Sequence, residues 1–449
     1  MRVVVVSHSA ADHLGGAEQS LLALLDHWTA HDPTVEPIVV GPKPSAAMTR
    51  EVAARGWRTL DLAMTGWAVW EVDGGRAQRR QREIENAAAT RRLVELVEHE
   101  RPHLAITNTL VMPWGAIAAA HTGVPHVWFV REFGERSQGF LYPGGRDTAL
   151  RDIGALSHTV IANSRAVAEA LQPHMPHREV AVVYPPVDLE RVRARALEPR
   201  ESEFDDASAL RVAVLGRVTR SKGQWRVIEA LARLGSGDVE VLFIGGILDA
   251  RADEQLQRRA NRLRVPAATR FVGEQANPFS IVAQADVCII PSEKEAFGRS
   301  TLECLALGKP VLTSRSGAGA ELVDDGRTGA VIDADDFDEW ARVLRGYLDD
   351  RSLAAAQHDA ARGRADAIAS GPHSLPLAVA MLTDAASGAP ARLPEQWRAW
   401  VDRLDETAAA STRGLALRAR LTRLGTLGVR AVRHPVRASR RVRALLAHR

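Results

Sequence analysis

A chain of 449 residues is too long for one ordinary hydrophobic core, so its length predicts two or three domains. The apolar run at residues 3–6 is shorter than the core of a signal peptide, and no run approaches the length of a membrane span. Only two cysteines occur, which favours a reduced, cytoplasmic protein without a metal–thiolate cluster. The net charge of +3 includes eleven arginines and no acidic residue in residues 411–449, so the rest of the chain carries −8.

The N-terminal residues 1–7 are expected to form a buried strand, followed by a glycine pair, Gly15 and Gly16, that opens a helix. Glycines between a first strand and a first helix let backbone N–H groups approach a ligand closely. An isolated Gly-Gly equally suits a tight turn without a ligand. Further strands are expected at residues 37–40 and 56–62.

Two tryptophans, Trp67 and Trp70, stand before an arginine-rich helix that contains Arg76 and Arg79. Exposed aromatic rings beside arginines suit stacking on a sugar or contact with a lipid surface. The same pattern suits the docking of a helix. Both tryptophans are therefore candidates for acceptor contact, with helix docking as the alternative.

The strands expected at residues 102–107 and 125–130 both end in polar residues. Asn108 follows the first strand, and Arg131 and Glu132 follow the second. Ligands gather at the carboxyl ends of strands in an open parallel sheet. These three residues are therefore candidates for contact with an acceptor or a sugar.

A polar stretch without periodicity, residues 196–209, is predicted to be a linker, after which a strand at residues 210–215 begins a second domain. The next loop carries Arg217 and Lys222, which can converge on a diphosphate, arginine as a fork and lysine as a point charge. They can also be solvated loop cations. Only four of the 58 basic residues are lysines, however, and this favours a specific use of Lys222.

The run from Pro291 to Glu303 follows an apolar strand and is expected to form a loop and a helix start. Glu295 would lie in the loop and Glu303 on the inner face of the helix, with seven residues between them. The first N–H groups of that helix would face an anion. They belong to Gly298, Arg299 and Ser300. A loop glutamate and an exposed helical glutamate are the plainer interpretation of the pair.

With the glycine-containing segments at residues 308–312 and 317–329, this run resembles the retaining, nucleotide-sugar-dependent glycosyltransferases of family 4. The resemblance is specific over residues 210–331 and looser before them. It implies an α/β protein of the GT-B fold, with two Rossmann-like, doubly wound domains facing a cleft. The expected parts are an acceptor domain (1–195), a nucleotide-sugar domain (210–370), a crossover helix region (371–389) and a basic tail (390–449).

The resemblance also implies roles for individual residues. Arg217 and Lys222 would stabilise the leaving diphosphate, Glu295 would bind the donor sugar and Glu303 the ribose. The other implied donor-binding residues are Gly15, Gly16, Gly273, Phe297, Gly298, Arg299 and Ser300. Because Arg217, Lys222 and the helix start would stabilise the charge on the leaving diphosphate, neither a metal nor a cofactor is expected. The family usually attacks from the front face with the leaving phosphate as base. Many members carry a histidine at the position of Arg131, and this difference leaves the role of Arg131 open.

In the tail, Leu417, Leu421 and Leu424 recur at helical spacing with arginines between them. Such a basic amphipathic helix favours an anionic membrane surface, and we expect a cytoplasmic protein that lies on the inner face of the membrane. A solvated tail and nonspecific binding of nucleic acid by charge are the alternatives. Asp333 and Asp335 resemble a D-x-D metal motif, but acidic residues there suit a helix start better.

The expected activity is transfer of a sugar from a nucleoside diphosphate donor to a hydroxyl group of a glycan, a lipid-linked acceptor or a small molecule. Two alternatives keep the same fold. A sugar-nucleotide epimerase would need carboxylates and histidines in the first domain, and a membrane-tethered scaffold would need no phosphate-binding residues.

Overall fold

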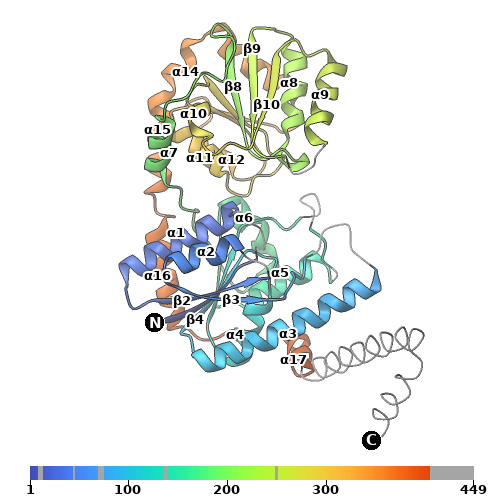
Figure 1. Ribbon diagram of the computed structural model, residues 1–449, viewed down its shortest axis with the longest axis vertical. Coiled ribbons are helices and arrows are strands. Elements are labelled where there is room, and N and C mark those ends of the chain that lie inside the picture. The colour runs from blue at the N-terminus through green and yellow to red at the C-terminus, as the bar shows by residue number, and fades with distance from the viewer. Residues whose placement is uncertain are drawn as a thin grey trace, which may run out of the picture.

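The computed structural model describes residues 1–8, 14–43, 46–68, 75–135, 140–142, 144–247 and 251–404. Two parallel sheets, one above the other in Figure 1, organise these residues into two domains. This arrangement confirms the predicted α/β class with two Rossmann-like domains. The basic helix predicted in residues 411–449 lies outside the described residues.

The first sheet has seven strands in the order β3-β2-β1-β4-β5-β6-β7. They are β1 Arg2–Val6, β2 Glu36–Pro42, β3 Arg58–Leu62, β4 Leu104–Asn108, β5 His126–Val130, β6 Thr159–Ala162 and β7 Val180–Val182. The order reverses beside β1, as in doubly wound sheets. The four valines of β1 are almost completely buried, because helices cover both faces of a parallel sheet.

The helices of this domain are α1 Gly16–His31, α2 Ala46–Ala54, α3 Arg76–Glu100, α4 Trp114–Thr122, α5 Arg146–Ala155 and α6 Arg165–Leu171. A short 3₁₀ helix, η2 Gln172–His174, follows α6. The leucines on the inner face of α1, Leu21 and Leu25 among them, are fully buried.

The second sheet has six strands in the order β10-β9-β8-β11-β12-β13. They are β8 Leu210–Leu215, β9 Val239–Ile244, β10 Ala268–Gly273, β11 Val287–Ile290, β12 Val311–Ser314 and β13 Gly329–Ile332. The other elements are η3 Arg220–Lys222, α8 Gln224–Leu234, α9 Ala252–Leu263, α10 Phe279–Val282, α11 Arg299–Ala306, α12 Gly319–Leu322, α13 Phe337–Asp349, α14 Ser352–Ala356 and α15 His358–Ala369. The sequence analysis did not predict β12 and β13, which have four residues each.

The chain passes to the second domain earlier than the predicted linker. Helix α7 (Leu189–Ala196) buries Leu189 and Val192 in the same core cluster as Leu302 of α11. The linker itself is docked, because Phe204 is buried in that cluster and the Asp205 and Asp206 amides donate to Glu240. Helix α7, which precedes the predicted boundary at residues 195–196, thus packs with the second domain.

Two C-terminal helices pack on the first domain. Helix α16 (Leu375–Ala386) buries Ala378 and Leu382 in the cluster that contains the α1 leucines. Helix α17 (Glu395–Val401) brings Trp397 and Trp400 against Trp114. Residues 390–404 are thus part of the folded first domain and do not belong to the tail in which the sequence analysis placed them.

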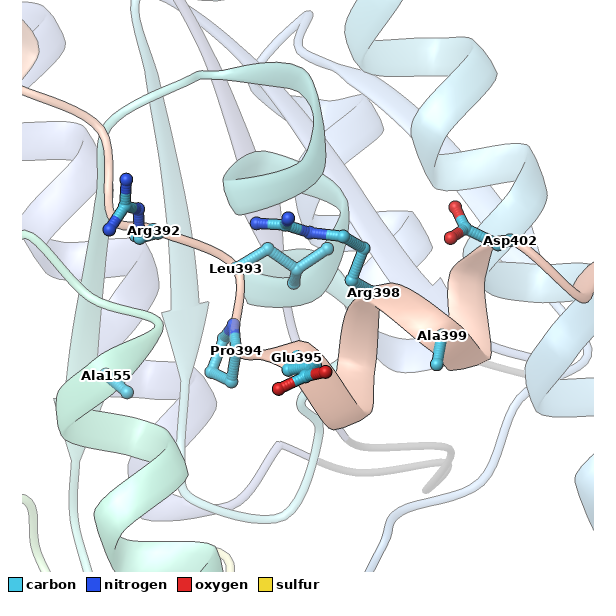
Figure 2. A pocket seen from close by; sticks show the side chains of 8 residues that line it. All are labelled: Ala155, Arg392, Leu393, Pro394, Glu395, Arg398, Ala399 and Asp402. Atoms are coloured by element: carbon cyan, nitrogen blue, oxygen red, sulfur yellow. The ribbon is translucent and has the colours of Figure 1, made fainter.

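Figure 2 shows how α17 lies beside the end of α5. The pocket there is lined by Ala155 and by charged residues of both signs, among them Arg398, Glu395 and Asp402. Leu393, at the start of the segment, is buried in the first-domain core. Among the described helices, none combines the length and the apolar character that crossing a bilayer requires.

Candidate functional site

A pocket of about 680 Å³ lies between the two domains at the carboxyl ends of their strands. Both domains line it. The first domain contributes His8, Gly16, Ala17, Ser20, Gly66, Ala68, Thr109, Val111, Met112, Arg131, Glu132, Phe140 and Asn163, and the second contributes Arg217, Lys222, Glu295, Ala296, Phe297, Gly298, Arg299 and Ser300, with Pro185 at the crossing. We call it the cleft. It brings together most of the predicted site residues.

A charged pair, Lys222 and Glu295, forms the centre of the second-domain wall. Lys222 Nζ lies 2.7 Å from Glu295 Oε2, and Ser292 Oγ donates to the same oxygen at 2.8 Å. Burial favours the neutral acid, but the Lys222 ammonium and these hydrogen bonds outweigh it and lower the pKa of Glu295. The wall therefore holds an ionised carboxylate beside a cation.

Close backbone packing fixes the loop that carries Glu295. Ala318 N donates to the Glu295 carbonyl at 2.8 Å, and Gly317 has a φ of +87°. A Cβ at Gly317 would lie 2.4 Å from the Glu295 carbonyl oxygen, so only glycine permits this approach. The position of Glu295 is therefore set by its backbone as well as by Lys222.

Helix α11 begins at Arg299 with Gly298 as its N-cap at a φ of +94°, as the sequence predicted for the helix start. The first N–H groups of a helix have no partner within it, so this end can hold an anion. The Arg299 side chain crosses to the first domain, where Nη1 donates to Pro186 O at 2.8 Å and lies 3.4 Å from Ser20 Oγ. Burial lowers the pKa of Arg299.

Glu303 lies behind Arg299 on the same helix and does not line the cleft directly. Its Oε1 is 3.9 Å from Arg299 Nη2. Burial raises the pKa of Glu303, and the Arg299 charge opposes that shift only in part. The pKa values of the two predicted glutamates therefore shift in opposite directions, that of Glu295 downward and that of Glu303 upward.

The two glycines of the predicted pair make different local contacts. The Gly15 N–H donates to Glu18 Oε2 at 3.1 Å, so that N–H is already engaged, and Gly15 does not line the cleft. A Cβ at Gly16 would lie 3.1 Å from Arg299 Cδ. Gly16 therefore makes room for the arginine that crosses from the second domain.

On the first-domain wall, Arg131 and Glu132 are tied to the loop around Asn108. Arg131 Nε donates to Asn108 Oδ1 at 2.6 Å, and Asn108 Nδ2 donates to Ala17 O at 3.2 Å. Glu132 accepts from the Leu110 N–H at 2.9 Å. Burial lowers the pKa of Arg131 to about 10 and raises the pKa of Glu132. No carboxylate among the described residues forms an ion pair with the Arg131 guanidinium.

The sequence analysis missed a histidine and an asparagine on this wall. His8, just after β1, places Nδ1 3.1 Å from Oε1 of the buried Glu18. Asn163, which is also buried, lines the cleft and donates to the Arg131 carbonyl at 3.1 Å. The positions of His8 and Asn163 in the sequence could have indicated them, because both follow a parallel strand and such residues reach the same edge of the sheet.

Besides Gly15, Asn108 and Glu303, which do not line the cleft, three more predicted residues lie away from it or outside the described chain. Gly273 ends β10 at a φ of +70° and does not line the cleft. Trp67 donates from Nε1 to Leu110 O at 2.7 Å and stacks on Trp128 at 5.9 Å between ring centroids, so helix and core packing is its structural role. It also lines a neighbouring pocket of about 410 Å³ with Trp397. Trp70 lies outside the described residues.

The aspartates near residue 333 serve the helix that follows them. Asp336 accepts from the Glu339 N–H at 2.9 Å and caps α13, and Asp335 pairs with Arg226 at 3.1 Å. Within the described ranges, no group of three or more His, Cys, Asp or Glu side chains is arranged to hold a metal ion.

Two protein families match this chain. Residues 198–364 match the family described as glycosyl transferases group 1, and residues 14–191 match glycosyltransferase family 4. The two matches fall on the two sides of the cleft. They cover the loop of Arg217 and Lys222, the pair of glutamates and most of the first-domain wall.

Curated relatives match part of the chain. D-inositol 3-phosphate glycosyltransferase of Corynebacterium urealyticum is 30% identical over 232 residues, which are 48% of this chain and 55% of that protein. Glycogen synthase of Mycobacterium tuberculosis is 32% identical over 189 residues, 41% of this chain and 44% of that one. The chain thus spans about half the length of the curated relatives it matches.

A solved structure matches more of the chain. Anabaena HepE, solved in complex with UDP, aligns with a TM-score of 0.68 at 20% identity and covers 86% of this chain and 100% of its own. At this identity the likeness concerns the fold.

Proposed function

The chain belongs to the glycosyl transferases group 1, with a family 4 domain on its N-terminal side, and from this membership we propose that it transfers a sugar from a nucleoside diphosphate donor to a hydroxyl group with retention at the anomeric carbon. The observation that supports this most is the Lys222–Glu295 pair, 2.7 Å apart beside the start of α11 in the cleft. The pair places a cation that can bind phosphate, Lys222, beside a carboxylate that can accept hydrogen bonds from sugar hydroxyls, Glu295.

The leaving group of such a reaction is a nucleoside diphosphate, on which negative charge develops. Lys222, Arg217 and the N-terminus of α11 at Gly298–Ser300 would stabilise that charge. Arg217 is exposed at the edge of the cleft, where it can fold onto a phosphate as a fork. The attacking hydroxyl would pass its proton to the leaving phosphate oxygen, so the chain itself needs no separate base for this step.

Glu295 would accept hydrogen bonds from the donor sugar and Glu303 from the ribose. The lowered pKa of Glu295 keeps it an acceptor over a wide pH range. Phe297, buried between Glu295 and α11, would hold the loop in place. Contact of Gly273 with the base stays a prediction, as does any part that Gly15 plays beyond its bond to Glu18.

The acceptor would enter along the first-domain wall, past Arg131, Glu132 and Asn108. The guanidinium of Arg131, which is half-buried and lines the cleft, can bind hydroxyls or an anionic group of an acceptor. A glycan, a lipid-linked sugar or a small molecule would suit this wall. We also propose that the arginines of residues 411–449 hold the protein at an anionic membrane surface.

UDP-sugars are the first donors to test, because Anabaena HepE was solved with UDP. A thermal-shift screen of UDP-, GDP-, ADP- and TDP-sugars distinguishes the bases. A donor present at about 100 times its dissociation constant stabilises the folded protein by about 2.7 kcal/mol. A screen in which none of the four raises the melting temperature would contradict the proposed donor site.

A sugar-nucleotide epimerase is a second candidate, because His8 and Glu132 line the first-domain wall and the buried Glu18 lies 3.1 Å from His8. The two activities differ in their need for an acceptor. An epimerase converts the bound donor to its epimer without any acceptor, whereas a transferase forms a glycoside only when an acceptor hydroxyl is supplied. NMR of the donor sugar after incubation alone separates them.

A further inference from the structure

A second pocket, of about 840 Å³, lies on the second domain between α8 and α9. It shares no lining residue with the cleft. Its lining residues are Val218, Thr219, Arg220, Gln224, Trp225, Ala252, Gln255, Leu256, Arg258, Arg259 and Arg262. We call it the arginine groove. The loop between β8 and α8 separates the two pockets, since Arg217 and Lys222 line the cleft while residues 218–220 line the groove.

The charge of the arginine groove is of one sign. Four arginines line it, and no described aspartate or glutamate does. Arg258 pairs with Glu254 at 2.7 Å, and Arg259 donates to Glu229 at 2.7 Å. Arg220 and Arg262 are exposed, and neither side chain has a hydrogen bond or an ion pair to the described residues. The groove therefore offers two guanidinium groups, on different elements, that are free to bind an anion.

A guanidinium group can donate two parallel N–H bonds to two oxygens of one phosphate. Arginines therefore suit phosphate better than they suit an anion that offers a single acceptor atom. Gln255, exposed on α9, adds an amide that can donate to or accept from a hydroxyl. We propose that the arginine groove is a second ligand site, for a phosphorylated sugar, with Arg220 and Arg262 on the phosphate and Gln255 on the hydroxyl groups. This site is separate from the donor site proposed in the cleft.

The groove and the cleft are connected through their shared loop. Gln224, a buried residue of the groove, donates from Nε2 to the Arg217 carbonyl at 2.9 Å. Thr219, which also lines the groove, caps η3 by accepting from the Lys222 N–H at 3.4 Å. A ligand held by Arg220 therefore fixes the loop that presents Arg217 and Lys222 to the cleft. If the held loop matches the geometry that binds the donor, each ligand strengthens binding of the other, and thermodynamic linkage makes the two factors equal, about fivefold or more.

Calorimetric titration of the full chain with ribose 5-phosphate tests the site, with inorganic phosphate as the minimal anion and ribose as the uncharged control. Ribose 5-phosphate and phosphate should bind, and ribose should not. Arg262→Ala should weaken binding of ribose 5-phosphate about tenfold to a hundredfold, as loss of a charged hydrogen bond does. Alanine suits a helix, so this exposed change on α9 preserves the fold.

Two further variants identify where the ligand binds. Arg342→Ala removes an exposed arginine of α13 that pairs with Glu339, and should leave ribose 5-phosphate binding within about twofold. Lys222→Ala should leave it within about threefold, because Lys222 faces the cleft. Equal losses in Arg262→Ala and Arg342→Ala would mean general charge attraction. A loss confined to Lys222→Ala would place the ligand in the cleft, and no binding to the wild type would remove the site altogether.

Coupling has its own measurement. Saturating ribose 5-phosphate should lower the dissociation constant of the nucleotide-sugar donor about fivefold or more in the wild type and leave it unchanged in Arg262→Ala. Weakened donor binding would mean competition in the cleft and would overturn the proposal. Absence of donor binding in either protein would instead contradict the proposed function, whereas ribose 5-phosphate binding in the groove would still be measurable.

Discussion

On the second-domain wall of the cleft the central carboxylate, Glu295, has a cation at 2.7 Å, whereas on the first-domain wall the central cation, Arg131, contacts the neutral amide of Asn108 at 2.6 Å. Burial acts on both groups. At Glu295 the charge of Lys222 outweighs the effect of burial and lowers the pKa. At Arg131 the nearby carboxylates do not outweigh burial, and the pKa of Arg131 falls to about 10. A buried charge without a paired ion is costly. On the second-domain wall the charged groups Lys222 and Glu295 therefore pair with each other. On the first-domain wall a ligand with a negative charge would stabilise Arg131.

The largest expected effect comes from removing Lys222 from the second-domain wall. Lys222→Ala should lower kcat/KM for sugar transfer about a hundredfold to a thousandfold, since charge stabilisation in the transition state is worth about 2.7–4 kcal/mol. Lys294→Ala is the matched control, because Lys294 lies in the same loop as Glu295 but pairs with Glu135 at 2.7 Å. Steady-state transfer assays should show the control within about threefold of the wild type. Near-normal turnover of Lys222→Ala would contradict its assignment.

The next largest effect is expected at Arg131 on the first-domain wall. Arg131→Ala should raise KM for the acceptor about tenfold to a hundredfold, because it removes charged hydrogen bonds. Arg131→Lys should recover only part of the loss, since lysine keeps the charge and not the fork. Initial rates at varied acceptor concentration measure both variants. An unchanged acceptor KM in Arg131→Ala would show that this wall does not contact the acceptor.

The pH dependence of donor binding sharpens the contrast within the second-domain wall. Because burial raises the pKa of Glu303, a fall in pH through that value protonates the carboxylate and removes an acceptor for the ribose hydroxyls. The donor dissociation constant should therefore increase about threefold to tenfold on the acidic side. Glu295, whose pKa is lowered, stays ionised over that range. In Glu303→Gln the acidic limb should disappear, and its persistence there would assign it to another group.

The smallest effect concerns the contact that holds the walls together. Glu321 of α12 accepts from the Arg165 and Ala166 N–H groups at 3.0 and 2.7 Å, at the start of α6 in the first domain, and from the Tyr184 hydroxyl at 3.0 Å. Glu321→Ala should lower the free energy of unfolding by about 1–2 kcal/mol in denaturant titration. Glu339→Ala, which breaks an exposed ion pair to Arg342, should cost less than about 0.5 kcal/mol. Equal costs would contradict a structural role for the interdomain contact.

The sequence predicted what short-range pattern determines. The apolar runs of β1 and β8 and the helix start at Gly298 follow from composition and from a loop-to-helix transition, and they agree with the structure. The four-residue strands β12 and β13 escaped prediction, because a short apolar run beside glycines and a proline has no period of its own. The arginine in place of the family histidine was recognised, but its partner Asn108 was not.

Long-range contacts were beyond the sequence. Nothing local indicates that Glu321 caps a helix of the other domain, or that the Gly16 backbone leaves room for Arg299. Trp397 and Trp400 indicate the docking of α17, since two tryptophans within one helical turn suit a buried face. The predicted tail begins at residue 390, before this helix.

The most direct test of the difference between the walls is the binding of UDP alone to the wild type, Lys222→Ala and Arg131→Ala, measured by calorimetry. If the second-domain wall binds the donor diphosphate by itself, Lys222→Ala should weaken UDP binding about tenfold or more, and Arg131→Ala should leave it within about threefold. The reverse ranking, with UDP binding lost in Arg131→Ala and kept in Lys222→Ala, would place the diphosphate on the first-domain wall and contradict the account.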